Sequence, residues 1–384
     1  MTIGFLSHLD ANLYRFRLPV MQALLDNGHR VYAIVPRGEY TEELSREGII
    51  TITYEIERSS LNPLKELVAI NMIYRAIKDL NLDILHTFMA KPNIYGTFAA
   101  RKAKIPVVVN TVTGLGSFFI DDSIKSKVIK KVIETLYKRV FNLSTGVIFQ
   151  NRDDKELFER SGIIKKSKSY LVRSSGVDTT YFYSSTVNIE DVKKLEDEFK
   201  VKEKKVVLMI ARAIWHKGIA EYSKAADILN RDDVEFLLVG GVDDGNPSNA
   251  SVSWLNEQKS INWLGERNDI KELIALSDIV VLPSYREGVP RTLLEAASMS
   301  KALVATDVPG CREVVEHEKN GLLVELKSSK SLSDAIGKLL NDEKLQDEYA
   351  TASRKKAIEE FDVKKVVSSY SEIYSKLLNV QNTD

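Results

Sequence analysis

The sequence predicts an α/β protein of two doubly wound domains, each built on a parallel sheet with helices on both faces. Three observations predict this architecture. The chain has 384 residues, of which 44% are hydrophobic, and this is enough for two cores of ordinary size. Short apolar runs alternate with longer helical patterns in two separate stretches. A turn-rich and then strongly charged segment around residues 174–205 divides the two stretches.

In the first stretch, apolar runs typical of buried parallel strands alternate with segments of helical periodicity. The expected strands are 3–6, 31–35, 49–54, 84–87, 107–110, 146–150 and 169–172. The expected helices include 19–27, 64–80, 95–104 and 123–141. Since parallel strands need crossover connections, usually helices, this alternation predicts right-handed βαβ units. The first domain is therefore expected to be Rossmann-like and to span residues 1–180.

Residues 181–205 are expected to link the domains, and a second alternation then begins at residue 206. The expected strands are 206–212, 236–241, 261–265, 278–284, 302–307 and 321–325. This pattern predicts a second Rossmann-like domain over residues 206–360. The expected helices after it are 331–340, 343–360 and 363–378. The C-terminal helix, within residues 361–384, is expected to pack back towards the N-terminal domain.

Composition excludes several classes of protein. Lys plus Arg and Asp plus Glu both total 54, so net charge does not favour a nucleic acid as partner. The single cysteine, Cys311, excludes an internal disulfide framework and is typical of a reducing cytoplasm. No stretch reaches the roughly eighteen consecutive apolar residues of a membrane span. The start, MTIGFLSHLD, is typical of a strand and not of a signal peptide. We expect a soluble or peripheral protein.

Two glutamates lie in the stretch 283–295, PSYREGVPRTLLE, directly after the apolar run 278–282. Pro290 suits the first turn of a helix, so Glu287 is expected in the loop before it and Glu295 inside it. In open α/β sheets, ligands bind outside the carboxyl ends of the strands, where helix N-termini offer N–H groups to anions. The residues alone leave two interpretations open, a ligand site or a pair of solvated surface glutamates.

The expected first strand of the second domain ends in ARAIWHKG, which places Arg212 and Lys217 on the turn before the next helix. Two cations at this position suit a diphosphate, since Arg grips oxygens in a forked way and Lys acts as a point charge. Gly218 would allow close backbone approach. Gly240 and Gly241 end the next expected strand, where either a nucleotide or an ordinary turn explains them. Ordinary surface charge is the alternative for the two cations.

The sequence lacks the motifs of several cofactor-dependent enzymes. No GxGxxG follows the first expected strand, and TGLGSFF has only Gly114 and Gly116. No P-loop, HExxH motif, cysteine cluster or Asp-x-Asp triplet occurs. These absences disfavour a dinucleotide-dependent oxidoreductase, an NTPase and a metal site, so no cofactor and no metal are expected. The histidines are scattered: His8, His29, His86, His216 and His317.

Polar residues also follow the first and fourth expected strands. His8 and Asp10 come after the first strand, and His86 and Lys91 come at the end of the fourth. Because the carboxyl ends of parallel strands share one edge, these side chains are expected to line the cleft opposite the diphosphate site. The alternative for each histidine is a hydrogen-bonded structural role.

One segment suggests contact with a membrane surface. Phe118 and Phe119 precede the helix expected over 123–141, which carries an apolar stripe that includes Val128 and Val132. Its basic residues include Lys127, Lys130 and Lys131. Basic amphipathic helices can lie on anionic membranes, although most amphipathic helices pack on their own sheet.

The motifs ARAIWHKG, PSYREGVPRTLLEA and TDVPGCREVVEHEKNGLLV, in this order and spacing, resemble the retaining GT-B glycosyltransferases of family four. The stretches NTVTGLGSFF and HTFMAKPNIYG are similar to its bacterial surface-polysaccharide branch. The resemblance covers nearly the whole chain. It implies metal-independent transfer of N-acetylgalactosamine from UDP-GalNAc to undecaprenyl-diphosphate-linked diacetylbacillosamine, in an α-1,3 linkage. This step would belong to bacterial protein N-glycosylation, at the cytoplasmic face of the inner membrane.

The resemblance also implies roles for individual residues. Arg212 and Lys217 would bind the donor diphosphate, Glu287 the donor sugar and Glu295 the ribose hydroxyls. The resemblance assigns catalysis to Glu287, Arg212, Lys217 and His86. The other implied donor-binding positions are Gly240, Glu266, Arg267, Gly288, Val289 and Pro290. The expected acceptor-binding set is Ser7, His8, Asp10, Asn12, Lys91, Gly114 and Gly116.

The chain departs from the family pattern at one place. Many relatives carry a sugar-contacting histidine just beyond the position of His86, where this chain has Phe88, Met89 and Ala90. His86 or Lys91 would have to substitute for it. The alternatives are a capsule or O-antigen transferase with another UDP-sugar, a UDP-N-acetylglucosamine 2-epimerase, and an inactive sugar-nucleotide-binding module. The basic Phe-rich segment counts against the epimerase, and the glutamate pair counts against the inactive module.

Overall fold

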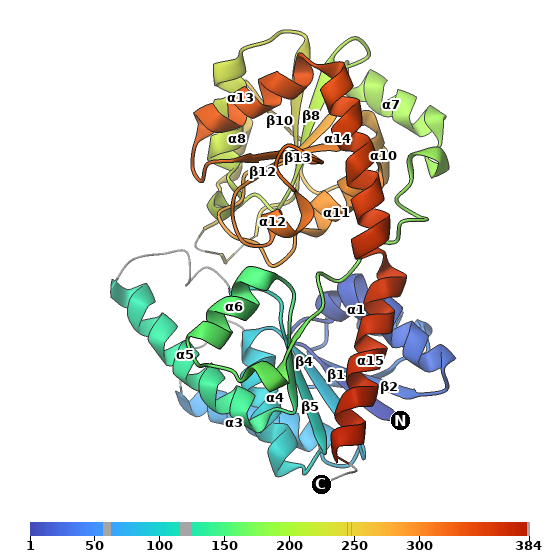
Figure 1. The fold of residues 1–384 in the computed structure, drawn as a ribbon, viewed down its shortest axis with the longest axis vertical. Coiled ribbons are helices and arrows are strands. Elements are labelled where there is room, and N and C mark those ends of the chain that lie inside the picture. Colours follow the sequence, from blue (N-terminus) through green and yellow to red (C-terminus); the bar gives the residue numbers. More distant parts are fainter. Residues whose placement is uncertain (57–62, 116–123, 244, 247, 382–384) are drawn as a thin grey trace. The chain divides into compact units, whose positions relative to one another are not determined.

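The computed structural model describes residues 1–56, 63–115, 124–243, 245–246 and 248–381. The chain forms two compact units, each organised around one parallel sheet (Figure 1). The first unit consists of Met1–Ser175 together with Val363–Asp384, and the second unit is Gly176–Asp362.

The described part of the first unit contains a seven-stranded parallel sheet in the order β3-β2-β1-β4-β5-β6-β7. The strands are β1 (Thr2–Leu6), β2 (Arg30–Val35), β3 (Ile50–Thr53), β4 (Ile84–Phe88), β5 (Val107–Val112), β6 (Gly146–Phe149) and β7 (Ser169–Leu171). In the register of the central pair, Phe5 of β1 lies opposite His86 of β4. The strand order reverses between these two strands, as expected for a doubly wound sheet.

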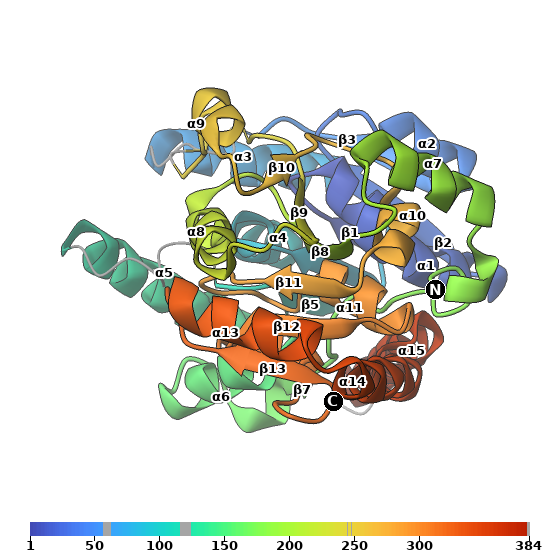
Figure 2. The ribbon, with the colours of Figure 1, turned by 90° about the horizontal axis from the view of Figure 1, so that it is seen from above.

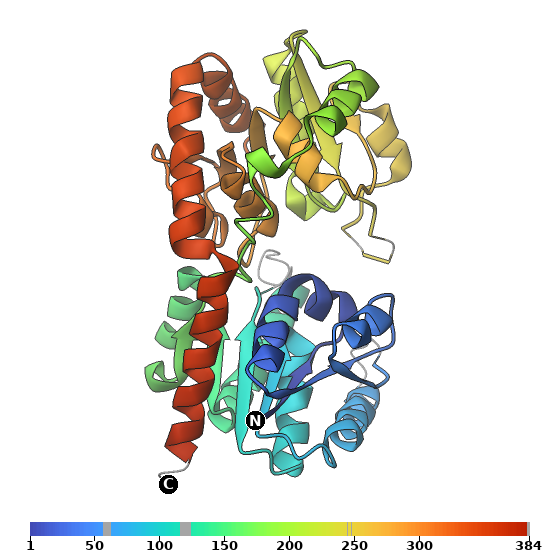
Figure 3. The same ribbon diagram turned by 90° about the vertical axis from the view of Figure 1, so that its right-hand side faces the viewer.

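Helices cover both faces of this sheet. They are α1 (Asp10–Asp26), α2 (Thr41–Arg46), α3 (Pro63–Ile77), α4 (Ala90–Lys102), α5 (Ile124–Leu143), α6 (Arg152–Arg160) and α15 (Val363–Gln381). Because strand side chains alternate between faces, Ile3 and Phe5 pack with α1 and α15 in one cluster, while Leu6 packs with α3 and α4 in another. Helix α15, the last in the chain, runs alongside this sheet (Figure 3) and buries Tyr370 and Tyr374 in its core.

The second unit contains a six-stranded parallel sheet in its described residues, in the order β10-β9-β8-β11-β12-β13. The strands are β8 (Lys205–Ile210), β9 (Val234–Val239), β10 (Asn262–Trp263), β11 (Ile279–Leu282), β12 (Ala302–Thr306) and β13 (Gly321–Val324). Here too the order reverses at the centre, between β8 and β11, where Leu208 lies opposite Val280. The sequence-based prediction of two parallel-sheet α/β units is confirmed.

The helices of the second unit are α7 (Ile189–Phe199), α8 (Ile219–Leu229), α9 (Val252–Glu257), α10 (Ile270–Leu276), α11 (Arg291–Ser298), α12 (Cys311–Val314), α13 (Ser329–Leu340) and α14 (Glu343–Lys356). Helices α8 and α13 pack side by side on one face of the sheet (Figure 2). Helices α10 and α11 bury Leu273 and Leu293 on the other face. A π-helical turn at Ala357–Phe361 follows α14.

Two helices begin earlier than the sequence pattern indicates. Helix α1 begins at Asp10 and continues through Pro19, the residue expected at its start. Helix α4 begins at Ala90 and not at Tyr95. Pro92 fits there because N–H groups in the first turn of a helix have no intrahelical partner.

The segment 181–205, predicted as a linker, contains α7. Val192 and Leu195 of this helix are buried, and Leu195 joins a core cluster of the second unit. The two residues lie three positions apart on one helix face, and the charged residues between and around them occupy the other faces. The charge run therefore belongs to a packed amphipathic helix of the second unit.

Among the residues that the structure describes, no helix is long and apolar enough to cross a membrane.

Candidate functional site

The candidate site lies at the carboxyl edge of the second sheet, beside the reversal of strand order. The loop after β8 (residues 211–218) leads to α8, and the loop after β11 (residues 283–290) leads to α11. Since β8 and β11 are neighbours in the sheet, their loops leave the same edge next to each other. This is the edge at which ligands bind in open α/β sheets.

The two loops touch through their backbones. Gly218 has φ of 79°, and a Cβ atom added there would lie 2.1 Å from the carbonyl oxygen of Pro283. The N–H of Tyr285 donates to the carbonyl of His216 at 2.9 Å. Only glycine combines this left-handed conformation with so close an approach, so Gly218 sets the distance between the loops.

Each loop supplies one member of an ion pair. The Nζ atom of Lys217 lies 2.5 Å from Oε1 of Glu287, and the two side chains are 21% and 12% exposed. Arg212, on the same turn as Lys217, is mostly exposed and is paired with Asp243 after β9. The turn thus carries two cations with different partners. Such cations can bind the oxygens of an anionic ligand at a strand terminus.

A third loop holds the backbone of Glu287. A Cβ atom on Gly310, which has φ of 84°, would lie 2.6 Å from the carbonyl oxygen of Glu287. The N–H of Glu287 donates to the carbonyl of Pro309 at 3.2 Å. Cys311 follows and is fully buried, and burial followed by the charge of Glu287 raises the pKa of its thiol. The thiol therefore stays protonated, as suits a packing residue.

Glu295 lies inside α11 and is 7% exposed. Its Oε1 accepts a hydrogen bond from Nε of Arg291 at 2.7 Å, one turn earlier. Burial raises the pKa of Glu295, while the charge of Arg291 acts in the opposite direction. Neither Glu287 nor Glu295 is therefore a solvated surface residue, which rules out the second interpretation of the sequence pattern.

The turn after β9 meets the loops on either side of it. Gly240 has φ of 144°, and a Cβ atom there would lie 1.9 Å from the carbonyl oxygen of Ala211. Its N–H donates to the carbonyl of Gly265 at 2.8 Å, and Nε1 of Trp263 donates to its carbonyl at 2.9 Å. A side chain at Gly240 would therefore separate three loops of the sheet edge.

The remaining predicted donor-binding residues have different surroundings. Glu266 is exposed, and its carboxylate lies 3.5 Å from a Cβ atom built on Gly241. Arg267 is committed to two carboxylates, with Nη1 2.7 Å from Glu198 of α7 and Nη2 2.6 Å from Asp269. Its guanidinium thus ties the loop after β10 to α7, a structural role that the sequence did not suggest. Three further predicted residues, Gly288, Val289 and Pro290, lie directly before the first turn of α11.

His86, predicted to be catalytic, is fully buried in the first unit. Its Nδ1 lies 2.5 Å from the hydroxyl of Tyr374 in α15, and its Nε2 lies 2.6 Å from the hydroxyl of Thr111 in β5. Burial, followed by the charge of Arg17, lowers the pKa of His86 well below its usual value. A neutral imidazole with both nitrogens hydrogen-bonded inside the core does not fit a catalytic role.

The predicted acceptor residues lie near the carboxyl edge of the first sheet. The carboxylate of buried Asp10 accepts hydrogen bonds from the N–H of Tyr40 at 2.7 Å and the hydroxyl of Thr41 at 3.2 Å. Asp10 therefore holds the loop between β2 and α2, which leaves it little capacity for a ligand. Lys91 is paired with Glu66 of α3 at 3.0 Å.

The other predicted acceptor residues make fewer contacts with neighbouring side chains. Ser7 is buried, and its hydroxyl accepts from the N–H of Leu9 at 3.2 Å. The side-chain oxygen of Asn12 is buried without a hydrogen-bond partner among the described residues. His8 is half-buried in the same connection, and Gly114 follows β5 with φ of 144°. The predicted positions outside the described residues are Gly116, Phe118 and Phe119.

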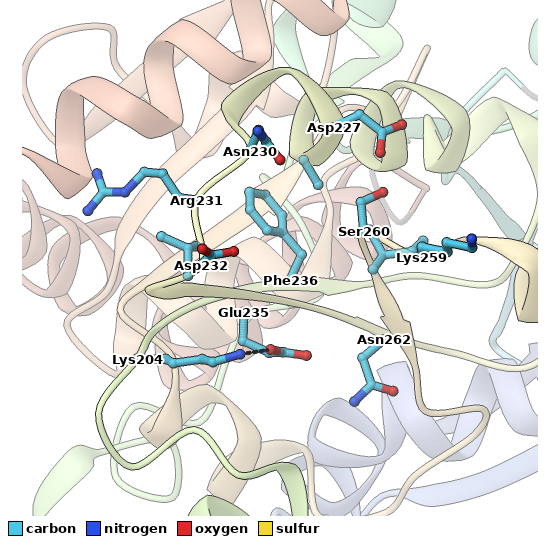
Figure 4. A pocket seen from close by; sticks show the side chains of 13 residues that line it. Lys204, Asp227, Asn230, Arg231, Asp232, Glu235, Phe236, Lys259, Ser260 and Asn262 are labelled. Carbon is cyan, nitrogen blue, oxygen red and sulfur yellow. Dashed lines mark hydrogen bonds and ion pairs between the residues drawn. The ribbon is translucent and has the colours of Figure 1, made fainter.

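A cavity of about 490 Å³ lies at the opposite, amino edge of the second sheet (Figure 4). It is lined by the end of α8 and the starts of β9 and β10, with Phe236 in its wall. Among its charged lining residues, Lys204 pairs with Glu235 at 2.9 Å, and Arg231 pairs with Asp233 outside the cavity at 2.6 Å. Because the cavity lies at the opposite edge of the sheet, it is remote from the loops that carry the candidate site. No cluster of three potential metal ligands occurs in the described part of the chain.

Two family models match the chain. The model described as glycosyl transferases group 1 matches residues 191–356, and the glycosyl transferase 4-like model matches residues 3–151. The chain is 39% identical over 378 residues to the N,N'-diacetylbacillosaminyl-diphospho-undecaprenol alpha-1,3-N-acetylgalactosaminyltransferase of Campylobacter jejuni. That match covers 98% of this chain and 99% of the relative.

Two more distant proteins are also similar. The UDP-Gal:alpha-D-GlcNAc-diphosphoundecaprenol alpha-1,3-galactosyltransferase of Escherichia coli is 28% identical over 321 residues, which covers 82% of this chain and 81% of that protein. The crystal structure of Anabaena HepE in complex with UDP-glucose has a TM-score of 0.80 and 21% identity, over 98% of this chain and 100% of that one. At that identity the structural likeness supports the fold alone.

The contact at Gly218 generates a stability prediction. We expect Gly218→Ala to lower the free energy of unfolding by roughly 2 kcal/mol or more. The alanine would be strained at the positive φ of this position, and its Cβ atom would also displace the backbone of Pro283. Gly245→Ala is the control, because Gly245 also has positive φ but has nothing within 4 Å of an added Cβ atom. Urea unfolding of both variants measures the difference. Equal losses would show that the loop contact is unimportant.

Burial of Glu295 generates a pH prediction. The pKa of Glu295 is raised in the folded protein. Its contribution to the free energy of unfolding is therefore greatest at pH values below the ordinary glutamate pKa, and this contribution is lost as the pH rises through the pKa of Glu295 in the folded protein. We therefore expect Glu295→Gln to unfold at a higher temperature than the wild type at pH 7, with the difference shrinking towards pH 4. Thermal unfolding between pH 4 and 8 measures it. A difference independent of pH would contradict this account.

Proposed function

The chain belongs to the glycosyl transferases group 1 family, and on that premise we propose that it moves N-acetylgalactosamine from UDP-GalNAc to a sugar on undecaprenyl diphosphate. The observation that carries this proposal is the 39% identity, over nearly the full length of both chains, to the Campylobacter jejuni enzyme whose name states that transfer. The proposed acceptor is diacetylbacillosamine and the proposed linkage is α-1,3. The step would belong to bacterial protein N-glycosylation.

The geometry at the carboxyl edge of the second sheet supports a division of roles. Lys217 and Arg212 would bind the donor diphosphate, since both cations lie on the turn before α8. Glu287 would bind the sugar, because its backbone is held by the loop after β12 and its carboxylate faces Lys217. Glu295 would accept hydrogen bonds from the ribose hydroxyls, as a buried carboxylate has several acceptor positions.

The proposed reaction retains the configuration of the donor sugar. The bond between the anomeric carbon and the β-phosphate oxygen breaks, and the bond to the acceptor oxygen forms on the same face of the sugar. The acceptor proton passes to the departing diphosphate. Lys217, Arg212 and the N-terminus of α11 would stabilise the negative charge that develops there, without charge compensation by a metal ion.

A lipid-linked acceptor requires the enzyme to work at a membrane surface, for which we propose the cytoplasmic face of the inner membrane. Helix α5 supports this placement because Val128 and Val132 are 59% and 53% exposed on it, beside exposed Lys127 and Lys131. Neither lysine forms an ion pair with a described residue. Exposed apolar side chains next to uncompensated lysines suit the interface of an anionic bilayer.

A second candidate is transfer of galactose from UDP-galactose. It is favoured by the 28% identity to the Escherichia coli galactosyltransferase, whose name states an α-1,3 transfer to a sugar on diphosphoundecaprenol. The two donors differ in one acetamido group, so only a few contacts decide between them.

A panel of UDP-sugars with the lipid-linked monosaccharide tests the proposed function. We expect UDP-GalNAc to give the highest kcat/KM, and NMR of the product to show an α-1,3 linkage. Glu287→Gln should lower kcat at least roughly a hundredfold, as loss of a charged contact to the reacting sugar does. Faster transfer from UDP-galactose would favour the second candidate. Unchanged turnover by Glu287→Gln would contradict the assigned site.

Vesicle binding tests the membrane proposal. Replacing Lys127, Lys130 and Lys131 by Glu should weaken binding to phosphatidylglycerol-containing vesicles about a hundredfold, since each lysine near the surface contributes about 1 kcal/mol. The effect should diminish in high salt. The matched control replaces three exposed lysines of the second unit by Glu, Lys200, Lys202 and Lys224. Equal effects of the two sets would contradict docking through α5.

A further inference from the structure

Tyr285 lies where three loops of the second unit meet. Its hydroxyl donates to Oε1 of Glu221 in the first turn of α8 at 2.8 Å. Its ring lies edge-on to His216 at 5.9 Å between centroids. Nζ of Lys327, from the connection between β13 and α13, lies 4.9 Å from the ring centroid. One side chain thus joins the loops that follow β8, β11 and β13.

The surroundings of Glu221 are not those expected of a residue that only stabilises the fold. Its Oε1 atom accepts the hydrogen bond from Tyr285, but its Oε2 atom is buried with no hydrogen-bond partner among the described residues. A buried carboxylate oxygen without a partner destabilises the folded state. A side chain that is kept at such a cost is a candidate for a role in function.

The Tyr285–Glu221 pair lies beside the ion pair of the candidate site. Glu221 follows Lys217 by four residues, and Tyr285 precedes Glu287 by two. The same two loops therefore carry both pairs. The backbone contacts at Gly218 and His216 fix how close the loops come. The hydrogen bond from Tyr285 to Glu221 adds a side-chain contact between the first turn of α8 and the loop after β11.

We propose that the hydrogen bond between Tyr285 and Glu221 is a clamp that positions Lys217 to face the diphosphate, and Glu287 to face the sugar, of one nucleotide-sugar. This inference rests on the proposed function for the identity of the ligand. Glu221 and Tyr285 are positioning residues, since they act through Lys217 and Glu287.

The chemistry of the clamp suits a permanent contact. Burial, followed by the hydrogen bond to Glu221, raises the pKa of the Tyr285 hydroxyl. The phenol therefore remains a donor at every pH at which the enzyme would work. When the clamp is removed, the backbone hydrogen bond from Tyr285 to His216 remains, so the loop stays attached while its side chains lose their orientation.

The test compares Tyr285→Phe, Glu221→Ala and Glu221→Gln with the wild-type protein. Calorimetry measures the affinity for UDP, a transfer assay measures kcat and KM for UDP-GalNAc, and thermal unfolding reports stability. Tyr285→Phe and Glu221→Ala should each lower UDP affinity and kcat/KM about tenfold, the effect of one lost hydrogen bond to a charged group. The double variant should lose no more than either single variant, because both remove the same contact.

Two comparisons separate positioning from general destabilisation. Glu221→Gln keeps an oxygen that accepts from Tyr285, so it should restore UDP affinity to within about twofold of the wild type. Tyr181→Phe is the matched control, because Tyr181 is an exposed tyrosine of the same unit with no side-chain hydrogen bond to a described residue. It should leave UDP affinity unchanged.

Wild-type UDP affinity in both Tyr285→Phe and Glu221→Ala would overturn the clamp. A loss that simply follows a lowered unfolding temperature, or one that Glu221→Gln fails to restore, would overturn it too. If the wild type binds UDP but does not use UDP-GalNAc, the proposed donor is wrong while the affinity measurements still decide the clamp. A wild-type protein that binds no UDP would overturn both proposals.

Discussion

The backbone contact between Gly218 and Pro283 is the constraint on which the candidate site depends. It brings the loops after β8 and β11 closer together than any side chain at position 218 would allow. At that distance Lys217 and Glu287 form an ion pair across the edge of the sheet. Gly240 and Gly310 also make close approaches on either side, with an added Cβ atom 1.9 and 2.5 Å from the nearest carbonyl oxygen, so the edge is built from backbone packed against backbone. The charged side chains are then presented by a surface with little freedom to shift.

The site combines this tight backbone with side chains that are unfavourable for stability. Glu295 is buried with a raised pKa, and Glu221 has a buried oxygen without a partner in the described structure. In a protein selected only for stability, apolar residues would serve better at both positions. Their concentration at one sheet edge, close to paired cations, is typical of a binding site whose residues are oriented before the ligand arrives.

The two units use polar residues at their carboxyl edges differently. In the second unit, polar side chains near the strand ends face one another across loops, as Lys217 faces Glu287. In the first unit, Asp10 holds a neighbouring loop, and His86 joins β4 to α15 and β5 through two hydrogen bonds. Other polar groups of the first unit have fewer partners. One is the side-chain oxygen of Asn12, in the first turn of α1, which has no hydrogen-bond partner among the described residues.

The sequence by itself determined the two parallel-sheet units and the position of Arg212, Lys217, Glu287 and Glu295 at one sheet edge. It could do so because strand and helix periodicity is local, and because a strand that ends in a loop places that loop at a known edge. Only the tertiary structure decided what each side chain faces. The periodicity of residues 189–199 was hidden by their charge, the buried position of His86 depends on Tyr374 far along the chain, and Arg267 is bound by Glu198 of another helix. Such partners are distant in sequence, and no local pattern encodes a contact between segments that meet only when the chain folds.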